Sequence, residues 1–298
     1  MTNDDGIESE GLHVLARTIA KAGHDTVVVA PNSDRSGVGA ALGLVHADQH
    51  LDSRRVEVVD LDVPAYALDG PPGMCVVAAR LGAFGDPPEM VVSGINAGLN
   101  TGRSILHSGT VGAALTAQNF GISGLAVSVD ADRESGVWPW SMAADLAVEV
   151  LDRFADAPAR TVINLNVPGR APVLGVRWAR LAAFGAARAA IAETPDGRLQ
   201  FELQTTGATP APDSDQGVVE AGYASITTIV GIAEAWPPGL DDATTMEARV
   251  VPGAPFAPVH TLPDASLPRW LHRPLAATNP VVPSEPEKAG PDGPPARQ

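Results

Sequence analysis

The sequence predicts an α/β protein built on a parallel sheet, and three observations lead to that expectation. Short β-branched runs alternate with helical stretches over residues 1–168. The 298-residue chain is 45% hydrophobic but only 4% aromatic, so its core should be aliphatic. Glycine-rich polar segments follow several of the runs, and open α/β sheets bind their ligands at such strand ends. Together these features favour a ligand-binding α/β core.

The first helix is expected directly after Asn3–Gly6. Five apolar residues share one helical face, and Gly23 stands where helices commonly end: Ile7, Leu12, Leu15, Ala16 and Ile19. Thr26–Ala30 is then a short run of the kind that buried parallel strands show, and Pro31 closes it.

Further strands and helices are expected in alternation along the chain. The strands are Val56–Leu61, Met90–Val92, Leu125–Val129 and Val162–Leu165. The helices are Met74–Leu81, Val111–Gln118 and Met142–Phe154.

The chain changes character after Pro168. Strands are expected at Val173–Trp178, Leu199–Thr205 and Ala224–Val230 with few helices between them, and Asp215 is placed to cap a short helix over 216–221. We therefore expect one domain over 1–235, with a core over 1–168 and a hairpin-rich appendage over 169–235. Residues 236–273 form an extension of uncertain structure, and 274–298, with seven prolines, should be disordered.

Composition excludes several partners. Twenty Lys and Arg against 35 Asp and Glu give a net charge of −15, so nucleic-acid polymers and anionic membranes are not expected partners. No apolar run reaches the roughly 18 residues of a membrane span. No basic segment follows Met1, so no signal peptide is expected, and the single cysteine, Cys75, fits a reducing cytoplasm. A cytoplasmic protein is predicted.

Two polar segments carry carboxylates or glycines that can serve a ligand. In Asn3–Gly6, the adjacent Asp4 and Asp5 can bind a metal, or they can cap a helix. Asp34–Gly39 includes Ser36 and two glycines, so its backbone amides can approach an anion, or it can be an ordinary loop.

Two more segments also carry residues that can serve a ligand. In Ser93–Gly98, small residues let Asn96 project its amide oxygen into a site, although asparagine also stabilises turns. His107–Gly112 opens a helix, where Ser108, Gly109 and Thr110 offer hydroxyls and free amides to a phosphate, or simply cap the helix. All four segments together favour a site with oxygen ligands for Mg²⁺ or Mn²⁺. Zinc-type Cys/His spacing, the Walker A pattern and Gly-x-Ser-x-Gly are absent.

At these residues the chain resembles the SurE survival-protein family of metal-dependent 5'-nucleotidases. The likeness spans roughly Thr2 to Val230, in an order and spacing that chance would not give. It consists of Thr2–Ile7, Arg35–Gly37, Val92–Gly98 with Asn100 and Gly102, Ser108–Ala114, Leu125–Ser128, and more weakly Asn164–Pro168 and Gly222–Thr227.

The resemblance implies a Rossmann-like core with a swapped hairpin or tail that builds homodimers or homotetramers. It implies one divalent cation, Mg²⁺ or Mn²⁺, on Asp4, Asp5, Ser36 and Asn96. It also implies that Ser108, Gly109 and Thr110 hold the phosphate of a nucleoside monophosphate, or of another small phosphate monoester, with Asn96 and Gly94 close by.

The expected chemistry is attack by a metal-activated water, with Asp4 or Asp5 orienting the water or accepting its proton. The alternative is a non-catalytic nucleotide or metabolite sensor on the same scaffold. Two departures from the family motivate this alternative: Gly70–Val76 replaces a segment that usually carries Thr and Asp, and the first strand is missing. In addition, His107 stands where the family usually has tyrosine. His107 is either a solvated loop residue or a substrate contact or proton donor to the leaving group.

The departure at the first strand lies at the start of the chain. The family normally has a short apolar strand before Thr2, whereas here Met1 stands immediately before it. Either the start lies upstream or the strand is truncated, and we expect the former, because losing a central strand leaves its neighbours' backbone groups unpaired.

Overall fold

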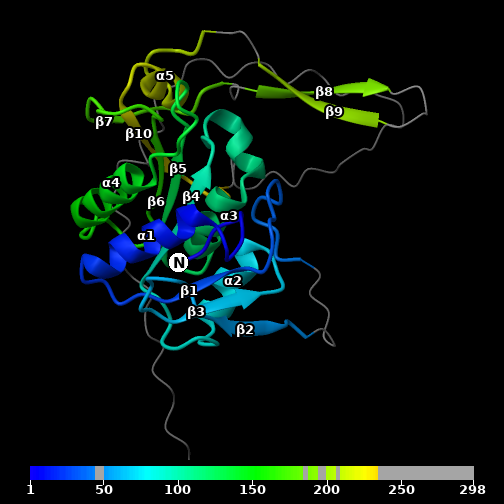
Figure 1. The fold of residues 1–298 in the computed structure, drawn as a ribbon, viewed down its shortest axis with the longest axis vertical. Helices are drawn as coiled ribbons and strands as arrows, with labels where there is room; N and C mark the ends of the chain where they lie inside the picture. The colour runs from blue at the N-terminus through cyan, green and yellow to red at the C-terminus, as the bar shows by residue number, and fades with distance from the viewer. Residues whose placement is uncertain (44–49, 184–186, 194–198, 206–208, 234–298) are drawn as a thin grey trace, which may run out of the picture. The chain divides into compact units, whose positions relative to one another are not determined.

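A computed structural model describes residues 1–43, 50–183, 187–193, 199–205 and 209–233, with side chains described outside 184–208. The predicted extension 236–273 and tail 274–298 lie outside the described residues. Within the described ranges the α/β class is confirmed: β1, β2 and β3 follow one another without a helix, and strands and helices alternate from α2 as far as β6 (Figure 1).

The larger sheet has five strands in the order β4-β5-β6-β10-β7. Its strands are β4 (Met90–Ala97), β5 (Ser123–Val129), β6 (Val162–Val167), β10 (Ala224–Ile229) and β7 (Val176–Trp178). Strands β4, β5 and β6 run parallel, β10 is antiparallel to β6, and β7 is parallel to β10. The Rossmann-like, mostly parallel sheet is thereby confirmed.

A second sheet has the order β1-β3-β2, from β1 (Val28–Pro31), β3 (Ala65–Leu68) and β2 (Ser53–Val56). Met1 and Thr2 lie between β1 and β4. The Met1 ammonium donates to the Val27 carbonyl (2.6 Å), and the Thr2 amide donates to the Val92 carbonyl (3.0 Å). Burial lowers the pKa of that ammonium to about 6. Residues at the position of the expected first strand thus connect the two sheets.

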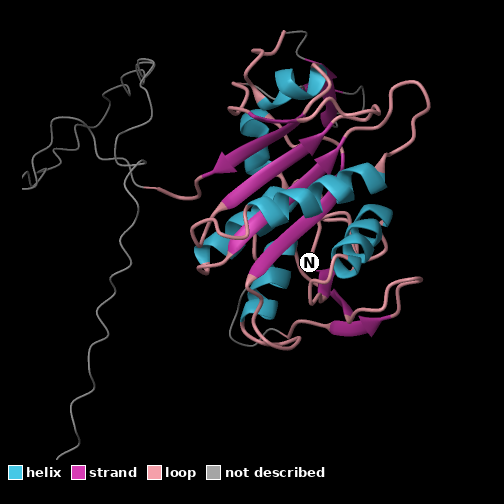
Figure 2. Ribbon diagram, turned by 90° about the vertical axis from the view of Figure 1, so that its left-hand side faces the viewer, coloured by secondary structure: helices cyan, strands magenta, loops and turns pink. Residues whose placement is uncertain are grey.

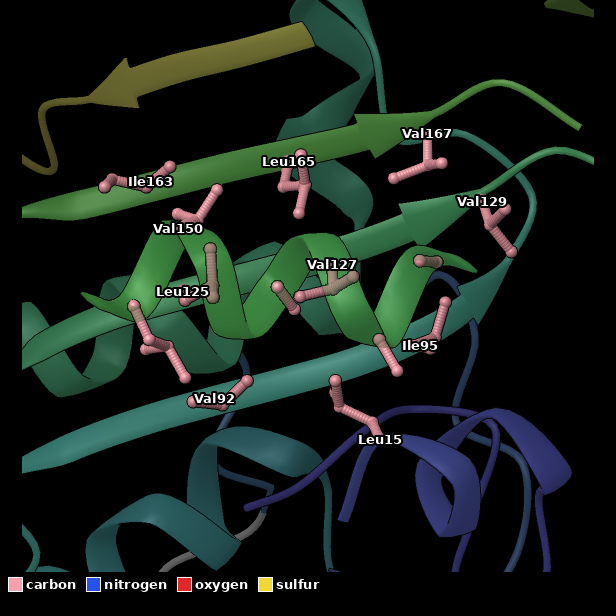
Figure 3. Close-up of a cluster of buried hydrophobic side chains, with 14 of the residues drawn as sticks. Leu15, Val92, Ile95, Leu125, Val127, Val129, Val150, Ile163, Leu165 and Val167 are labelled. Carbon is pink, nitrogen blue, oxygen red and sulfur yellow. The ribbon is translucent and has the colours of Figure 1, made fainter. Parts of the chain in front are cut away.

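Helices cover both faces of the larger sheet (Figure 2). Helices α1 (Glu10–Lys21) and α4 (Trp140–Arg153) contribute to the main apolar core on one face, while α3 (Gly109–Asn119) and α2 (Pro72–Arg80) contribute to smaller clusters on the other. Figure 3 shows α4 lying over alternate residues of β5 and β6: Leu125, Val127, Val129, Ile163, Leu165 and Val167.

The opposite face of β5 and β6 carries polar residues, because side chains alternate along a strand. Ser128, Asn164 and Asn166 are each 0% exposed. This face meets the segment that leads through a 3₁₀ turn, η1 (Gly102–His107), into α3. Buried polar residues of this kind need hydrogen-bond partners, and Asn100, just before the turn, bonds to all three.

Two predicted strands were placed wrongly. Val56–Leu61 was expected, but β2 ends at Val56; its exposed residues include Arg54 and Arg55, whose charges hid the strand. Strand β3 was not predicted. Met90–Val92 was too short, since β4 continues through a register shift between Ser93 and Asn96 and carries Asn96 within the strand.

Region 169–235 divides between two sheets. Strands β7 and β10 join the larger sheet, whereas β8 (Ala187–Glu193), which was not predicted, and β9 (Leu199–Thr205) form an antiparallel hairpin. Helix α5 spans Asp215–Glu220. Its cap is Ser214, not Asp215 as expected, because the Ser214 hydroxyl accepts from the Gly217 amide. A search of the described residues found no helix with the length and apolarity to cross a membrane.

Candidate active site

Asp4 lies at the N-terminus of α3, in the middle of the candidate site. One of its carboxylate oxygens accepts a hydrogen bond from the Thr110 hydroxyl, and the other accepts from the Gly109 amide at 3.1 Å. Asp4 is only 3% exposed. Burial raises the pKa of its carboxyl, while these hydrogen bonds oppose the shift. Asp4 and two of the predicted phosphate-binding residues are therefore in direct contact.

Gly109 makes this close contact possible. A Cβ atom at position 109 would lie 2.7 Å from Asp4 Cβ and 2.8 Å from Asp4 Oδ2. No side chain fits there without displacing the carboxylate, so glycine is needed for steric reasons. Ser108 is the cap of the helix, since its hydroxyl oxygen accepts from the Val111 amide at 3.1 Å.

Asn96 reaches the same point from the end of β4. Its amide nitrogen donates to the Gly98 carbonyl (2.7 Å), which turns the amide oxygen towards the Thr110 hydroxyl, 3.3 Å away. Thr110 is itself fully buried. The Thr110 hydroxyl thus joins Asp4 and Asn96, which are far apart in the sequence.

Asp5 differs from Asp4 in having a free oxygen. Its Oδ2 atom is buried and has no hydrogen-bond partner. Burial, and then the charges of Asp4 and Asp34, raise the pKa of Asp5 to about 6, although a backbone hydrogen bond from Ala97 lowers it. A carboxylate with a buried, unpartnered oxygen beside a second carboxylate is suited to a bound cation.

The loop after β1 borders this carboxylate pair. The Arg35 amide donates to the Asp4 carbonyl at 2.7 Å. Ser36, which is exposed, donates both its amide and its hydroxyl to Asp34 Oδ1, at 2.7 and 2.6 Å, and these bonds lower the pKa of Asp34. Ser36 therefore lies in the neighbouring loop, with its hydroxyl directed to Asp34.

Asp34 itself was not predicted as a site residue. Its charge raises the pKa of Asp5, so it belongs to the electrostatic surroundings of the pair. The sequence did contain a signal for Asp34. An aspartate side chain commonly accepts a hydrogen bond from the backbone amide two residues further on, which here is that of Ser36.

Gly94 and His107 are not among the residues that donate hydrogen bonds to the Asp4 carboxylate. The Gly94 amide donates to the Thr2 carbonyl (2.9 Å), and a Cβ atom on Gly94 would lie 2.3 Å from the Val127 carbonyl oxygen. Gly94 thus permits close strand packing beneath Asn96. The His107 side chain is exposed, and its carbonyl accepts from the Gly39 amide at 3.1 Å.

The donor set fits a hard divalent cation. Asp5 Oδ2 is a buried oxygen without a partner, and Asp4 and Asn96, which share the Thr110 hydroxyl, supply further oxygens. Among the described residues there is no group of three or more His, Cys, Asp and Glu suited to a metal. Amide or hydroxyl oxygens must therefore complete any coordination shell, as Mg²⁺ and Mn²⁺ accept.

Fold and site together define a class of α/β protein in which an oxygen-rich acidic site meets a helix N-terminus at the carboxyl edge of a parallel sheet. Residues 1–187 match the family model described as "Survival protein SurE". The chain belongs to the SurE family, and the resemblance noted in the sequence is confirmed.

Individual relatives agree with this assignment. The chain is 35% identical over 238 residues to the "5'-nucleotidase SurE" of Xanthomonas campestris pv. campestris (strain B100), covering 77% of this chain and 88% of that protein. The protein of the same name from Xanthomonas euvesicatoria pv. vesicatoria (strain 85-10) is 36% identical over the same length. The crystal structure of the SurE protein from Aquifex aeolicus is similar with a TM-score of 0.61 and 28% identity, covering 76% of this chain and 91% of that one.

Proposed function

We propose that this chain is a metal-dependent 5'-nucleotidase, which hydrolyses nucleoside 5'-monophosphates to nucleosides and phosphate. The observation that carries the proposal is the meeting of Asp4, Asn96 and Thr110 at the N-terminus of α3, with an unpartnered oxygen of Asp5 beside them. The relatives named 5'-nucleotidase support the same activity. No observation favours the alternative of a non-catalytic sensor.

Asp4, Asp5 and Asn96 hold the cation, and the Ser36 hydroxyl completes the set from the neighbouring loop. A bound Mg²⁺ or Mn²⁺ supplies a Lewis acid for a phosphoryl oxygen and lowers the pKa of a bound water. The fit of the donors supports one divalent ion, and the oxygen-only set favours these two metals over zinc.

The remaining residues bind the phosphate and handle the proton. The Ser108 hydroxyl and the Gly109 and Thr110 groups at the start of α3 bind phosphate oxygens, because a helix N-terminus favours negative charge. Asn96 orients the phosphate from the strand side, and Gly94 leaves room for the strand beneath it. Asp4 or Asp5 would orient the attacking water or accept its proton, and the hydrogen bonds from Gly109 and Thr110 hold the Asp4 carboxylate in place. His107 contacts the nucleoside side of the substrate.

The proposal includes the setting of the enzyme. It acts in the cytoplasm, which the single, buried and free Cys75 supports. It assembles into homodimers or homotetramers, for which the β8–β9 hairpin provides the exchange element.

The direct test is phosphate release from a panel of nucleoside monophosphates with Mn²⁺ or Mg²⁺, repeated with a chelator. We expect release that stops when the metal is removed and returns when it is added back. Turnover that persists in the chelator, or a folded, metal-loaded protein that releases no phosphate from any nucleotide, would contradict the proposal.

A further inference from the structure

The two halves of the site are joined by one connecting segment. Asn96 lies at the end of β4, and η1 runs directly into Ser108, the cap of α3. Where residues 100–102 are held therefore decides how far the helix N-terminus lies from Asn96. Two separate groups of buried side chains hold this segment.

The first group consists of side chains on β5 and β6 that hydrogen-bond to Asn100. The Asn100 amide donates to Asn166 Oδ1 (2.8 Å), and its side-chain nitrogen donates to the Ser128 hydroxyl (2.8 Å). The Asn100 carbonyl accepts from Asn166 Nδ2 (2.9 Å) and from Asn164 Nδ2 (2.8 Å). Both main-chain groups of Asn100 are therefore bonded to strand side chains that are themselves 0% exposed.

The second group is the carboxylate of Asp215, the first residue of α5. Its Oδ2 accepts from the Gly102 amide at 2.8 Å, and its Oδ1 accepts from the amides of Ala182 (2.9 Å) and Gln216 (2.8 Å). The side chain is 0% exposed. Asp215 thus connects residues 113 apart in the sequence by a charge-assisted hydrogen bond, which is among the stronger kinds.

A buried carboxylate is costly, and an apolar side chain could fill the same space at less cost. Among the described residues, the Asp215 carboxylate makes no hydrogen bond to Asp4, Asp5, Asn96 or the start of α3. The three hydrogen bonds that its carboxylate accepts all come from backbone amides, so the carboxylate fixes main-chain positions. The amide that lies furthest away in the sequence belongs to the segment that carries the phosphate-binding residues.

We infer that Asp215 is a positioning residue of the active site, which with Asn166 fixes residues 100–102 and so sets the position of the α3 N-terminus relative to Asn96. This inference rests on the proposed function, since the group that the positioned residues receive is the phosphate of the substrate. Asp215 acts through Gly102 and η1 and does not itself contact the reacting atoms.

The test is Asp215→Asn. Asparagine has nearly the same shape, but its NH₂ group replaces one carboxylate oxygen and, being a donor, cannot accept the bond from a backbone amide. We expect the dissociation constant of inorganic phosphate, measured by calorimetry with Mn²⁺ present, to rise about tenfold, as for one lost charged hydrogen bond. The KM for nucleotide should rise by a similar factor with little change in kcat. Mn²⁺ affinity should change less than phosphate affinity, because the Asp215 carboxylate makes no hydrogen bond to Asp4, Asp5 or Asn96 and acts on Asp4 and Asn96 only through the start of α3.

Two neighbouring variants separate positioning from loss of stability. Ser214→Ala removes the cap of α5 and should lower the melting temperature without weakening phosphate binding. Asp213→Asn removes an exposed carboxylate, 3.7 Å from Arg180, and should change neither. If Ser214→Ala weakens phosphate binding as much as Asp215→Asn, the role of Asp215 is only structural.

Should Asp215→Asn fail to fold, Ser128→Ala is a milder test, because it removes one neutral hydrogen bond from the group that holds Asn100. Phosphate binding should then weaken roughly two- to threefold. Unchanged phosphate affinity in both variants overturns the inference. If the wild type releases no phosphate from nucleotides, it is the proposed function that fails. Hydrogen exchange at residues 102–108 then still decides the inference: faster exchange in Asp215→Asn than in Ser214→Ala supports it, and equal exchange overturns it.

Discussion

Two places in this molecule contain buried aspartates near the start of a helix, and they differ in what their oxygens do. At α5, Asp215 is surrounded by three backbone amides, which leave both of its oxygens bonded. At α3, Asp4 is bonded by Thr110 and Gly109, while the adjacent Asp5 keeps a buried oxygen without a partner. Burial raises the pKa at all three residues.

On the proposed function, the difference separates carboxylates that hold the fold from carboxylates that receive a ligand. A saturated carboxylate has its desolvation offset by hydrogen bonds within the protein. An unsaturated pair of like charges is unfavourable until a cation binds, and it persists because the surrounding fold holds it in place. Removing charge at Asp5 should therefore act on activity and stability in opposite directions.

The largest expected effect follows from Asp5→Asn. Activity should fall roughly a thousandfold, which corresponds to about 4 kcal/mol of lost transition-state stabilisation, because both the cation and the proton acceptor are affected. Initial rates over a range of Mn²⁺ concentrations measure this loss. Near wild-type activity in the variant would place the proton acceptor and the metal elsewhere.

The same substitution should stabilise the metal-free protein at neutral pH. The pKa of Asp5 is raised from 3.8 to about 6, so between these values the folded state binds more protons than the unfolded state. Stability contributed by this group is therefore present below pH 3.8 and is lost as pH rises towards 6. Asp5→Asn should melt at a higher temperature than the wild type at pH 7 and at the same temperature below pH 4.

A matched control for this prediction is Asp132, a half-buried aspartate whose pKa is lowered by hydrogen bonds from Ser135. The charged Asp132 carboxylate stabilises the folded protein, the opposite of Asp5. Asp132→Asn should therefore not gain stability at pH 7. Equal shifts in both variants would point to net charge as the cause and would remove the distinction between the two kinds of carboxylate.

Gly109→Ala should have the next largest effect. The new Cβ atom meets Asp4 and must displace either the carboxylate or the start of α3. A displacement of about 1 Å at a catalytic group commonly costs about a hundredfold in rate. Gly121→Ala is the comparison, because position 121 has open space and a φ of +85°, so it should lose stability but keep its activity.

Metal binding should be weaker in acid than at neutral pH. Because Asp5 has a pKa near 6, a proton competes with the cation below that value, and ligand carboxylates bind metals in their charged form. We expect Mn²⁺ affinity, measured by calorimetry, to fall towards tenfold per pH unit below about pH 6. Affinity that is constant between pH 5 and pH 7 would exclude Asp5 as a ligand.

The smallest effect is expected from Ser36→Ala. The Ser36 side chain is exposed and its hydroxyl donates to Asp34, so as a neutral ligand it adds little beside two carboxylates. Mn²⁺ affinity should weaken about threefold, on the scale of one neutral hydrogen bond. A loss as large as that of Asp5→Asn would make Ser36 an equal partner of the carboxylates.

The sequence was most informative where a signal is local. Short motifs at strand and helix ends predicted Asp4, Asp5, Asn96 and Ser108 to Thr110 as site residues, and the structure brings Asp4, Asn96, Gly109 and Thr110 together. The same reasoning missed β2, whose exposed arginines obscure its strand character, and cut β4 short, because Ser93-Gly94 is typical of a turn. Local preference gave way there to pairing with a neighbouring strand.

Taken by itself, the chain determined the α/β class, the polar segments at the strand ends and the family, since all three depend on periodicity and on short motifs. Only the tertiary structure decided that Asp215 holds Gly102, that Asn166 holds Asn100, and that Asp5 keeps an oxygen free while Asp215 does not. The reason is physical. Which hydrogen-bond donors reach a buried carboxylate depends on groups more than a hundred residues away, and no local preference encodes their approach.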